Sequence, residues 1–201
     1  YKHGELVAKG CRGVWSEPLM PGKYAFNTYA GNIMKVPTTN VILKWISNQT
    51  GNHKYDENLK EVSLITKDAF EPSLPLSVVF HIDYRKAPLV IQRFGDIKML
   101  VDQTLDPMIS AYFKNIGQTK TLIELIQQRN EIQGQSSKEM QGKFEHYNLE
   151  LEEVLIGTPG GSKSDNNIET ILTQLRSRQI AREQLETYET QQKAAEKEKE
   201  L

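Results

Sequence analysis

The sequence predicts an α+β domain followed by one long C-terminal helix, and three patterns indicate this class. Residues 77–85 alternate between apolar and polar side chains, which is typical of a half-buried strand. Residues 88–94 and 97–116 then place apolar side chains three and four residues apart, as amphipathic helices do. Residues 168–201 contain neither Gly nor Pro and are rich in charge. We therefore expect helices packed on a sheet, with a separate helical segment after them.

The first part of the chain, up to residue 46, reads as β-rich. Apolar and aromatic residues alternate on both sides of a Pro- and Gly-containing stretch at 18–22. Because such a stretch favours chain reversal, we expect a hairpin formed by residues 13–17 and 23–27.

The next part predicts two further strands and the connections around them. Residues 41–46 and 61–66 have strand character, and the polar stretch 47–60 predicts a surface loop between them. Residues 66–70 predict a turn. The two prolines that follow this turn cannot donate to a regular ladder, so we expect a loop or a sheet edge there.

After the two central helices, the sequence predicts a third helix and a last strand. The helix covers 121–145, and Gly134 and Gly142 are expected to weaken its middle. The strand covers 147–156, with an irregularity at Glu152-Glu153 because the apolar alternation shifts there.

We divide the chain into a domain at 1–157, a Gly/Ser/Asn-rich linker at 158–167 and a helical segment at 168–201. A helix of that length would extend about 50 Å. Its apolar residues are too sparse for the face of a globular domain, and isolated helices are marginal in water. We therefore expect it to pack side by side with other helices in an oligomer, rather than to stand alone in solvent.

The residues expected at this helical interface are the apolar ones. They are Ile168, Ile171, Leu172, Leu175, Ile180, Leu185 and Tyr188. A heptad repeat drawn through the first of them is imperfect, because Arg178 and Arg182 occupy positions that aliphatic residues would fill in a regular coiled coil.

Composition excludes several classes of function. The net charge is −1 with both signs interspersed, which gives no electrostatic reason to expect nucleic acid as a partner. The single cysteine, Cys11, cannot form an internal disulfide; it is either a small half-buried residue or an acyl anchor near a membrane. No run of 18 apolar residues is present to span a bilayer. Because the chain starts at Tyr1 without Met, we expect it to be a fragment.

Residues 157–164 come close to a phosphate-binding loop, which would indicate a nucleotide hydrolase. That motif requires Gly immediately before its Lys, and here Ser162 precedes Lys163. A Gly/Ser linker explains the same residues, so hydrolase activity is only a remote alternative.

No other pattern indicates catalysis or metal binding. The four histidines, His3, His53, His81 and His146, show no ligand spacing. The carboxylate pairs Glu152/Glu153 and Asp102/Asp106 are of a kind common on solvated surfaces. We expect no enzyme activity and no cofactor or metal.

Residues 13–156 contain a series of different short motifs in a characteristic order. They are Gly13-Val14, Glu17-Pro18-Leu19-Met20-Pro21-Gly22-Lys23-Tyr24, Thr66-Lys67-Asp68, Ile82-Asp83-Tyr84-Arg85, Ala87-Pro88, Phe94-Gly95-Asp96, Asp106-Pro107, Leu122-Ile123-Glu124-Leu125 with Arg129, and Tyr147-Asn148-Leu149-Glu150-Leu151. In order and spacing they resemble the SPFH or Band 7 domain, the family of stomatin, prohibitin, flotillin and the bacterial HflK and HflC proteins. The chain departs from the family at Ala69, where Gly is usual, and in the proline-containing segment 71–75.

The resemblance implies a curved, mostly antiparallel sheet with packed helices, followed by a coiled-coil segment. It implies a membrane-associated scaffold that assembles with itself or with a paralogous subunit into large oligomers organising a membrane patch and its proteins. The alternative is a regulator or adaptor of a membrane-bound AAA protease. Members are anchored by an N-terminal hydrophobic segment, which we expect to lie outside this chain.

Four residues near such an anchor are expected to lie close to membrane lipid. They are Trp15, Leu19, Met20 and Tyr24. The predicted hairpin would present these large apolar side chains near its tip, which favours contact with a membrane surface.

Overall fold

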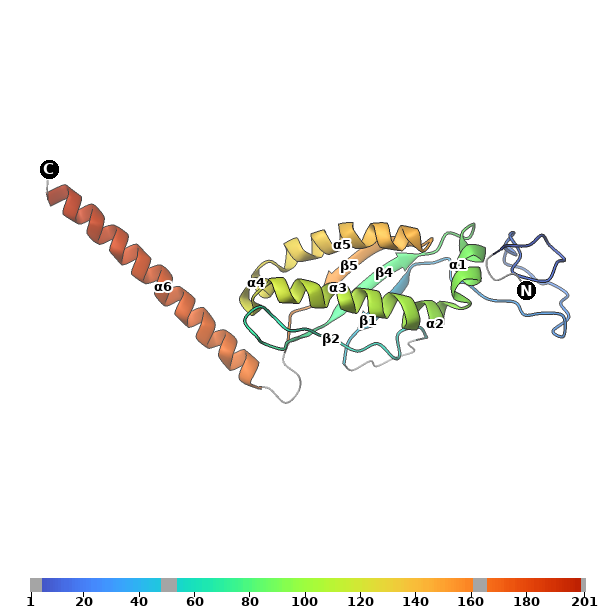
Figure 1. Cartoon of the computed structure of the whole chain (residues 1–201), viewed down its shortest axis with the longest axis horizontal. Helices are drawn as coiled ribbons and strands as arrows, with labels where there is room; N and C mark the ends of the chain where they lie inside the picture. Colours follow the sequence, from blue (N-terminus) through green and yellow to red (C-terminus); the bar gives the residue numbers. More distant parts are fainter. Residues whose placement is uncertain (1–4, 48–53, 161–165, 200–201) are drawn as a thin grey trace. The chain divides into compact units, whose positions relative to one another are not determined.

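The computed structural model describes residues 5–47, 54–160 and 166–199, and within the last helix it describes the side chains at 170 and 172–196. The chain forms two compact units, Tyr1–Pro159 and Gly160–Leu201. The first unit is α+β and the second is helical, as the sequence predicts (Figure 1).

The main sheet of the first unit has three antiparallel strands in the order β1-β4-β5. They are β1 (Val41–Trp45), β4 (Leu76–His81) and β5 (Glu150–Ile156). Alternate side chains of β1 and β4 are buried, so the predicted alternation is confirmed. The central strand ends at His81 rather than at Arg85, because the Asp83 carboxylate accepts the Arg85 amide at 2.9 Å and turns the chain.

The predicted irregularity in the last strand is confirmed as a β-bulge. Val79 pairs with Glu153 and Phe80 pairs with Leu151, which leaves Glu152 without an opposite residue. The extra residue shifts the alternation, so apolar side chains on both sides of the bulge reach the core.

A second, two-stranded sheet pairs β2 (Val62–Ser63) with β3 (Ser73–Leu74). It is shorter than the predicted strand 61–66, because Pro72 and Pro75 flank its partner and cannot donate to a longer ladder. Thr66–Phe70 forms the predicted turn, in which the Thr66 amide donates to the Phe70 carbonyl at 2.9 Å. The predicted surface loop 47–60 is partly wrong: Asp56 and Leu59 are buried, and the Asp56 carboxylate accepts the Lys44 amide of β1.

The predicted first helix is α1 (Ala87–Phe94), which Gly95 ends at a φ of 83°. The predicted second helix is one run of α2 (Ile97–Leu100), a π-helical segment (Val101–Leu105) and α3 (Asp106–Thr119). Pro107 has no amide hydrogen and its ring crowds the carbonyl four residues earlier, so the helix widens just before it.

The predicted third helix is two helices, α4 (Leu122–Gln127) and α5 (Arg129–His146). The break lies at Gln128 and not at Gly134 or Gly142. These two glycines lie inside α5, and a Cβ added to either would have no neighbouring atom from outside its own helical turn within 4 Å. α4 begins with a capping box, in which Thr121 and Glu124 exchange side-chain and backbone hydrogen bonds. These hydrogen bonds lower the pKa of the Glu124 carboxyl.

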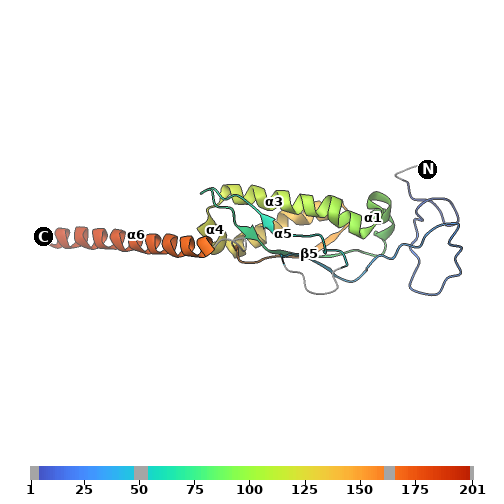
Figure 2. The ribbon, with the colours of Figure 1, turned by 90° about the horizontal axis from the view of Figure 1, so that it is seen from below.

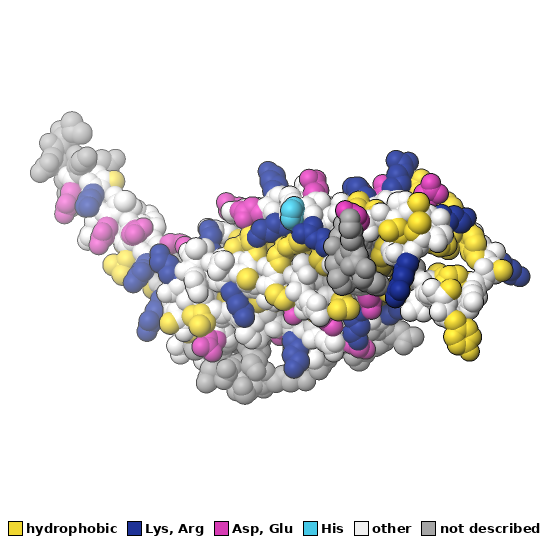
Figure 3. Space-filling view, turned by 45° about the vertical axis from the view of Figure 1, so that its right-hand side comes forward, with side chains coloured by type: hydrophobic (Ala, Val, Ile, Leu, Met, Phe, Trp, Pro, Cys, Tyr) yellow, Lys and Arg dark blue, Asp and Glu magenta, His cyan; other side chains and the backbone are white. Residues whose placement is uncertain are grey.

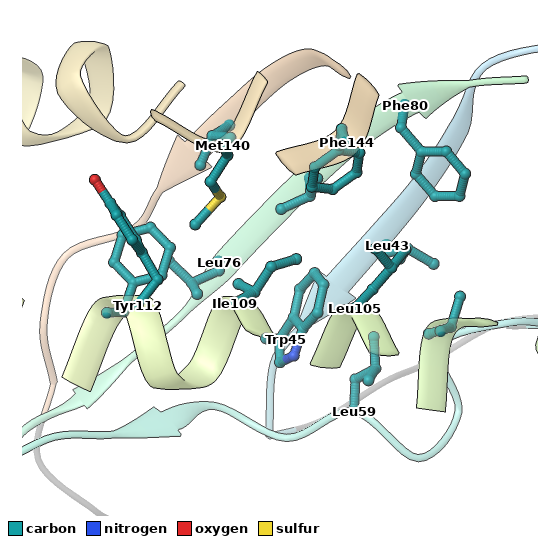
Figure 4. Packing of buried hydrophobic residues seen from close by; sticks show 14 of the residues in the cluster. Leu43, Trp45, Leu59, Leu76, Phe80, Leu105, Ile109, Tyr112, Met140 and Phe144 are labelled. Atoms are coloured by element: carbon teal, nitrogen blue, oxygen red, sulfur yellow. The ribbon is translucent and has the colours of Figure 1, made fainter. Parts of the chain in front are cut away.

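The core lies between the sheet and the helices that cover one of its faces (Figures 2 and 4). Trp45 and Phe80 from the sheet point toward Ile109 of α3 and Phe144 of α5, and all four are buried. The Trp45 indole Nε1 donates to the Asp106 carboxylate at 2.7 Å, which satisfies its buried polar atom.

The predicted N-terminal hairpin is wrong. The described N-terminal residues contain one isolated bridge, between Val7 and Trp15, and residues 23–27 form no strand. Tyr24 and Phe26 are exposed, because no neighbouring strand in the described part covers them. Alternation alone therefore did not identify a strand here.

The second unit contains α6 (Asn166–Lys199), a single helix of 34 residues. It begins two residues before the predicted start.

Candidate functional site

Three of the predicted interface residues of α6 are exposed, and two others are half-buried. Ile180, Leu185 and Tyr188 are 55%, 61% and 68% exposed, whereas Leu172 and Leu175 are half-buried. The side chains of Ile168 and Ile171 lie outside the described ones. The structure thus places large apolar side chains in solvent on a helix whose other residues are mostly polar.

These residues do not form one stripe. Successive residues of an α-helix are turned by about 100°, so Leu175 and Ile180, five residues apart, point roughly 140° away from each other. By the same rule, Tyr188 also points away from Leu175. α6 therefore carries apolar side chains on different faces at different heights.

The predicted membrane-proximal residues occupy a segment without regular secondary structure. Leu19, Met20 and Tyr24 are exposed, Met20 by 58%, and Trp15 is half-buried. The Trp15 Nε1 donates to the Cys11 carbonyl, and the Tyr24 hydroxyl donates to the Met20 carbonyl at 2.7 Å. Local hydrogen bonds hold both aromatic side chains, and the apolar atoms of the segment remain accessible.

The exposed apolar segment extends further than the sequence prediction. Phe26, Tyr29, Ile33 and Met34 are also exposed, and Tyr29 is 99% exposed. Hydrophobic side chains of this part reach the surface at the right of Figure 3. The prediction treated Phe26 as a strand residue and did not consider the three that follow it. Their signal in the sequence is the scatter of large apolar residues among Gly, Pro and Asn over 19–34, a composition that does not favour a regular element.

The residues of the near phosphate-binding loop are only partly described, since 161–165 lie outside the described ranges. At Gly157, an added Cβ would lie 2.5 Å from the Pro75 Cγ, and the Gly157 amide donates to the Pro75 carbonyl at 2.8 Å. Close packing beside β3 and β4 therefore explains this glycine without a phosphate.

Both carboxylates of the candidate pair Asp102/Asp106 accept hydrogen bonds from other segments of the first unit. Asp106 accepts from Trp45, and Asp102 accepts from the Asn58 side chain at 3.3 Å. The His146 carbonyl accepts from the Arg93 guanidinium at 2.9 Å. Within the described ranges, no three His, Cys, Asp or Glu side chains are grouped so that they would hold a metal ion.

Cys11 is exposed, so the half-buried position considered for it is wrong. His3 and His53 lie outside the described residues. Of the helices in the described part, none has the length and apolar character needed to cross a bilayer.

Comparison with protein-family models identifies the class of protein. Residues 6–200 match the model described as the SPFH domain / Band 7 family. The chain therefore belongs to this family, whose members are generally membrane-associated and non-enzymatic scaffolds. A comparison with curated proteins gave no match.

Proposed function

We propose that the protein is a membrane-associated scaffold whose subunits assemble through α6, while the N-terminal part of residues 1–157 lies at the lipid surface. The observation that carries this proposal is the exposure of Ile180, Leu185 and Tyr188 on a helix of 34 residues. A long helix of this polarity gains little stability by itself, and neighbouring helices would cover its apolar side chains.

The apolar faces of α6 favour an assembly larger than a pair. A two-stranded coiled coil covers one stripe of each helix. Leu175 and Ile180 point in different directions, so covering both requires neighbours on two sides. Subunits joined in this way form rings or extended arrays rather than isolated dimers.

The N-terminal segment supports the membrane part of the proposal. Leu19, Met20 and Tyr29 are exposed together in one stretch of chain, which is unusual for a surface that meets only water. Large apolar and aromatic side chains insert into the headgroup region of a bilayer and gain free energy there.

The assembly is tested by measuring the mass of the full chain in solution and by chemical crosslinking on vesicles. We expect the chain alone to be a monomer or small oligomer and to form large crosslinked species on vesicles. Leu175→Asp with Tyr188→Asp, which places a charge on each of two apolar faces, should abolish the large species. Arg176→Gln with Glu183→Gln is the control, because it changes two exposed positions and keeps the net charge. A monomer under all conditions would overturn the proposal.

Membrane contact is tested by flotation with phosphatidylcholine vesicles. We expect the unaltered chain to float and Leu19→Asp with Met20→Asp to reduce the floated fraction, because charged side chains resist insertion. Ile65→Asp is the matched control, since Ile65 is an exposed apolar residue outside the N-terminal segment. Flotation that both variants leave unchanged would contradict lipid contact by this segment.

The alternative function, restraint of a membrane-bound AAA protease, requires the same assembly and an additional partner. Purification of the assembled protein from its native membrane distinguishes the two: a protease that copurifies in constant ratio favours the adaptor function, and its absence favours the scaffold.

A further inference from the structure

The five methionines of the chain differ in their exposure to solvent. Met20, Met34 and Met99 are exposed, whereas Met140 is buried and Met108 packs against the core. Oxidants in solution react with a thioether where its side chain is accessible. Three methionines are therefore open to oxidation, and two of them, Met20 and Met34, lie in the N-terminal segment to which lipid contact is assigned above.

Met20 and Met34 share a local arrangement. Each directly follows an exposed branched aliphatic residue, Leu19 in one case and Ile33 in the other. Neither methionine lies in a helix or a strand, and the buried residues of the core all lie within 41–156. A chemical change at either side chain therefore alters the surface of the N-terminal segment and leaves the packing of the core intact.

We propose that Met20 and Met34 are oxidation sites, and that their conversion to methionine sulfoxide by hydrogen peroxide releases the N-terminal segment from lipid. The proposal rests on the membrane contact proposed above. Oxidation converts a flexible apolar side chain into a polar one. The sulfoxide oxygen accepts hydrogen bonds from water, and it loses them at a cost in free energy when it enters an apolar environment. Two sulfoxides therefore oppose insertion of the segment that carries them.

Each oxidation transfers one oxygen atom and two electrons between the peroxide and the sulfur. A lone pair of the thioether forms the S–O bond while the O–O bond breaks, and the proton on the transferred oxygen passes to the departing hydroxide. The products are methionine sulfoxide and water, so the sulfur is oxidised and the peroxide is reduced. Methionine sulfoxide reductases reverse the change at the expense of a thiol, one enzyme for each sulfoxide epimer. Oxidation at these two residues thus makes lipid contact reversible.

Met99 provides a control within the same chain. It is 45% exposed, close to the 47% of Met34, but it lies on α2 and outside the N-terminal segment. Peroxide should therefore oxidise Met99 as well, and the sulfoxide at this position should have no effect on lipid contact. Exposure and position are in this way tested separately.

The test uses the full chain with Cys11→Ser, because Cys11 is exposed and peroxide also oxidises thiols. Peptide mass spectrometry first measures how fast each methionine gains an oxygen atom. We expect Met20, Met34 and Met99 to be oxidised several-fold faster than Met140. Equal rates at Met20, Met34 and Met140 would overturn the assignment of the oxidation sites.

Flotation with phosphatidylcholine vesicles then measures lipid contact, and each chain is compared with its own untreated sample. Peroxide should lower the floated fraction several-fold in the Cys11→Ser chain, and equally so when Met99→Leu is added. Met20→Leu with Met34→Leu should remove most of this loss, because leucine fills a similar volume and has no sulfur. A loss as large in this double variant as in the Met99→Leu chain would overturn the proposal.

A variant that carries a polar oxygen without any oxidant tests the cause. Met20→Gln with Met34→Gln should float several-fold less than Met20→Leu with Met34→Leu, whereas Met99→Gln should match Met99→Leu. Equal flotation of the two double variants would overturn the proposal.

Reversal tests the same cause in the oxidised Cys11→Ser chain. Methionine sulfoxide reductases with dithiothreitol should restore its flotation. A floated fraction that stays low after mass spectrometry shows both sulfoxides to be reduced would contradict control by these residues.

The untreated sample separates failure of this inference from failure of membrane contact. A chain that floats equally before and after complete oxidation of Met20 and Met34 would overturn the inference and leave the proposed function in place. A chain that does not float before treatment would overturn the membrane part of the proposed function and this inference with it.

Discussion

Ala69 occupies a backbone conformation that L-amino acids avoid. Its φ is 62°, in the left-handed region, where the Cβ crowds the following carbonyl. The Thr66–Phe70 turn holds Ala69 in this conformation. The Thr66 hydroxyl donates a hydrogen bond to the Asp68 carboxylate and accepts one from the Phe70 amide at 3.0 Å. The Asp68 carboxylate also accepts the Leu122 amide, so the turn caps the start of α4. The departure from the family's usual Gly is therefore a point of strain at a structural junction.

Ala69→Gly should raise the free energy of unfolding by about 0.5–1 kcal/mol, because relief of the Cβ contact exceeds the entropy that glycine loses on folding. Urea denaturation measures the change. Asn148, also at a φ of 62°, provides the comparison. Because Asn tolerates the left-handed region, Asn148→Gly should raise the free energy of unfolding by less than Ala69→Gly does. A lower or unchanged midpoint for Ala69→Gly would contradict strain at this position.

Two helical glycines have opposite surroundings. At Gly117 of α3, an added Cβ would lie 2.8 Å from the Leu64 Cδ1 and 3.3 Å from the Ile65 carbonyl oxygen. At Gly134 of α5, nothing lies within 4 Å. Gly117 thus lets α3 pack directly on the segment that contains β2, whereas Gly134 serves no such contact.

Gly117→Ala should lower the free energy of unfolding by about 1–3 kcal/mol, because the packed neighbours must shift. Gly134→Ala should raise it by about 1 kcal/mol through helix propensity alone. Thermal and urea unfolding of both variants measure the difference. Destabilisation of equal size at the two positions would show that the close approach at Gly117 does not govern its effect.

Elements were predictable from the sequence where the pattern is strictly local. The shift of alternation at Glu152-Glu153 predicted a bulge, and Pro88 and Gly95 predicted the ends of α1 closely. The break at Gln128 was not predictable, because no Gly or Pro marks it and the nearby glycines suggested other positions. The prediction of an N-terminal hairpin was wrong for a related reason. Tyr24 and Phe26 alternate as strand residues do, but a strand also requires a neighbouring strand to pair with.

At the scale of the whole chain, the first unit has a core of its own. The buried residues of the hydrophobic core lie between Val41 and Ile156. None of the described side chains of α6 belongs to it, and the first unit ends at Pro159. The described core is thus formed within the first unit, while α6 is the part to which we have proposed to assign assembly.

A chain that ends at Pro159 should therefore unfold at the same temperature as the full chain, since the core is complete without α6. It should also fail to form the large species on vesicles. Calorimetry and crosslinking of the two chains check both statements. Loss of cooperative unfolding on truncation would show that α6 supports the core.

Some features of the two candidate surfaces, on α6 and on the N-terminal segment, were predictable from the sequence and others were not. The helix α6 was predictable, because its segment contains neither Gly nor Pro. Its few apolar residues and the many charged residues around them are visible in the sequence. That Leu175 and Ile180 face different directions depends on helix geometry, which places residues five positions apart on different sides. The exposure of Tyr29 and Met34 was not predictable, because burial depends on what packs against a residue.

The sequence by itself determined the α+β class, the central strand with its following helices, and a separate helical tail, because these depend on spacing along the chain. Only the tertiary structure decided which apolar residues are covered: Trp45 and Phe80 are buried beneath the helices that cover the sheet, whereas Tyr24 and Phe26 remain 48% and 41% exposed. A local pattern shows that a face is apolar. Burial requires a second surface of matching shape, and that surface comes from residues distant in the sequence.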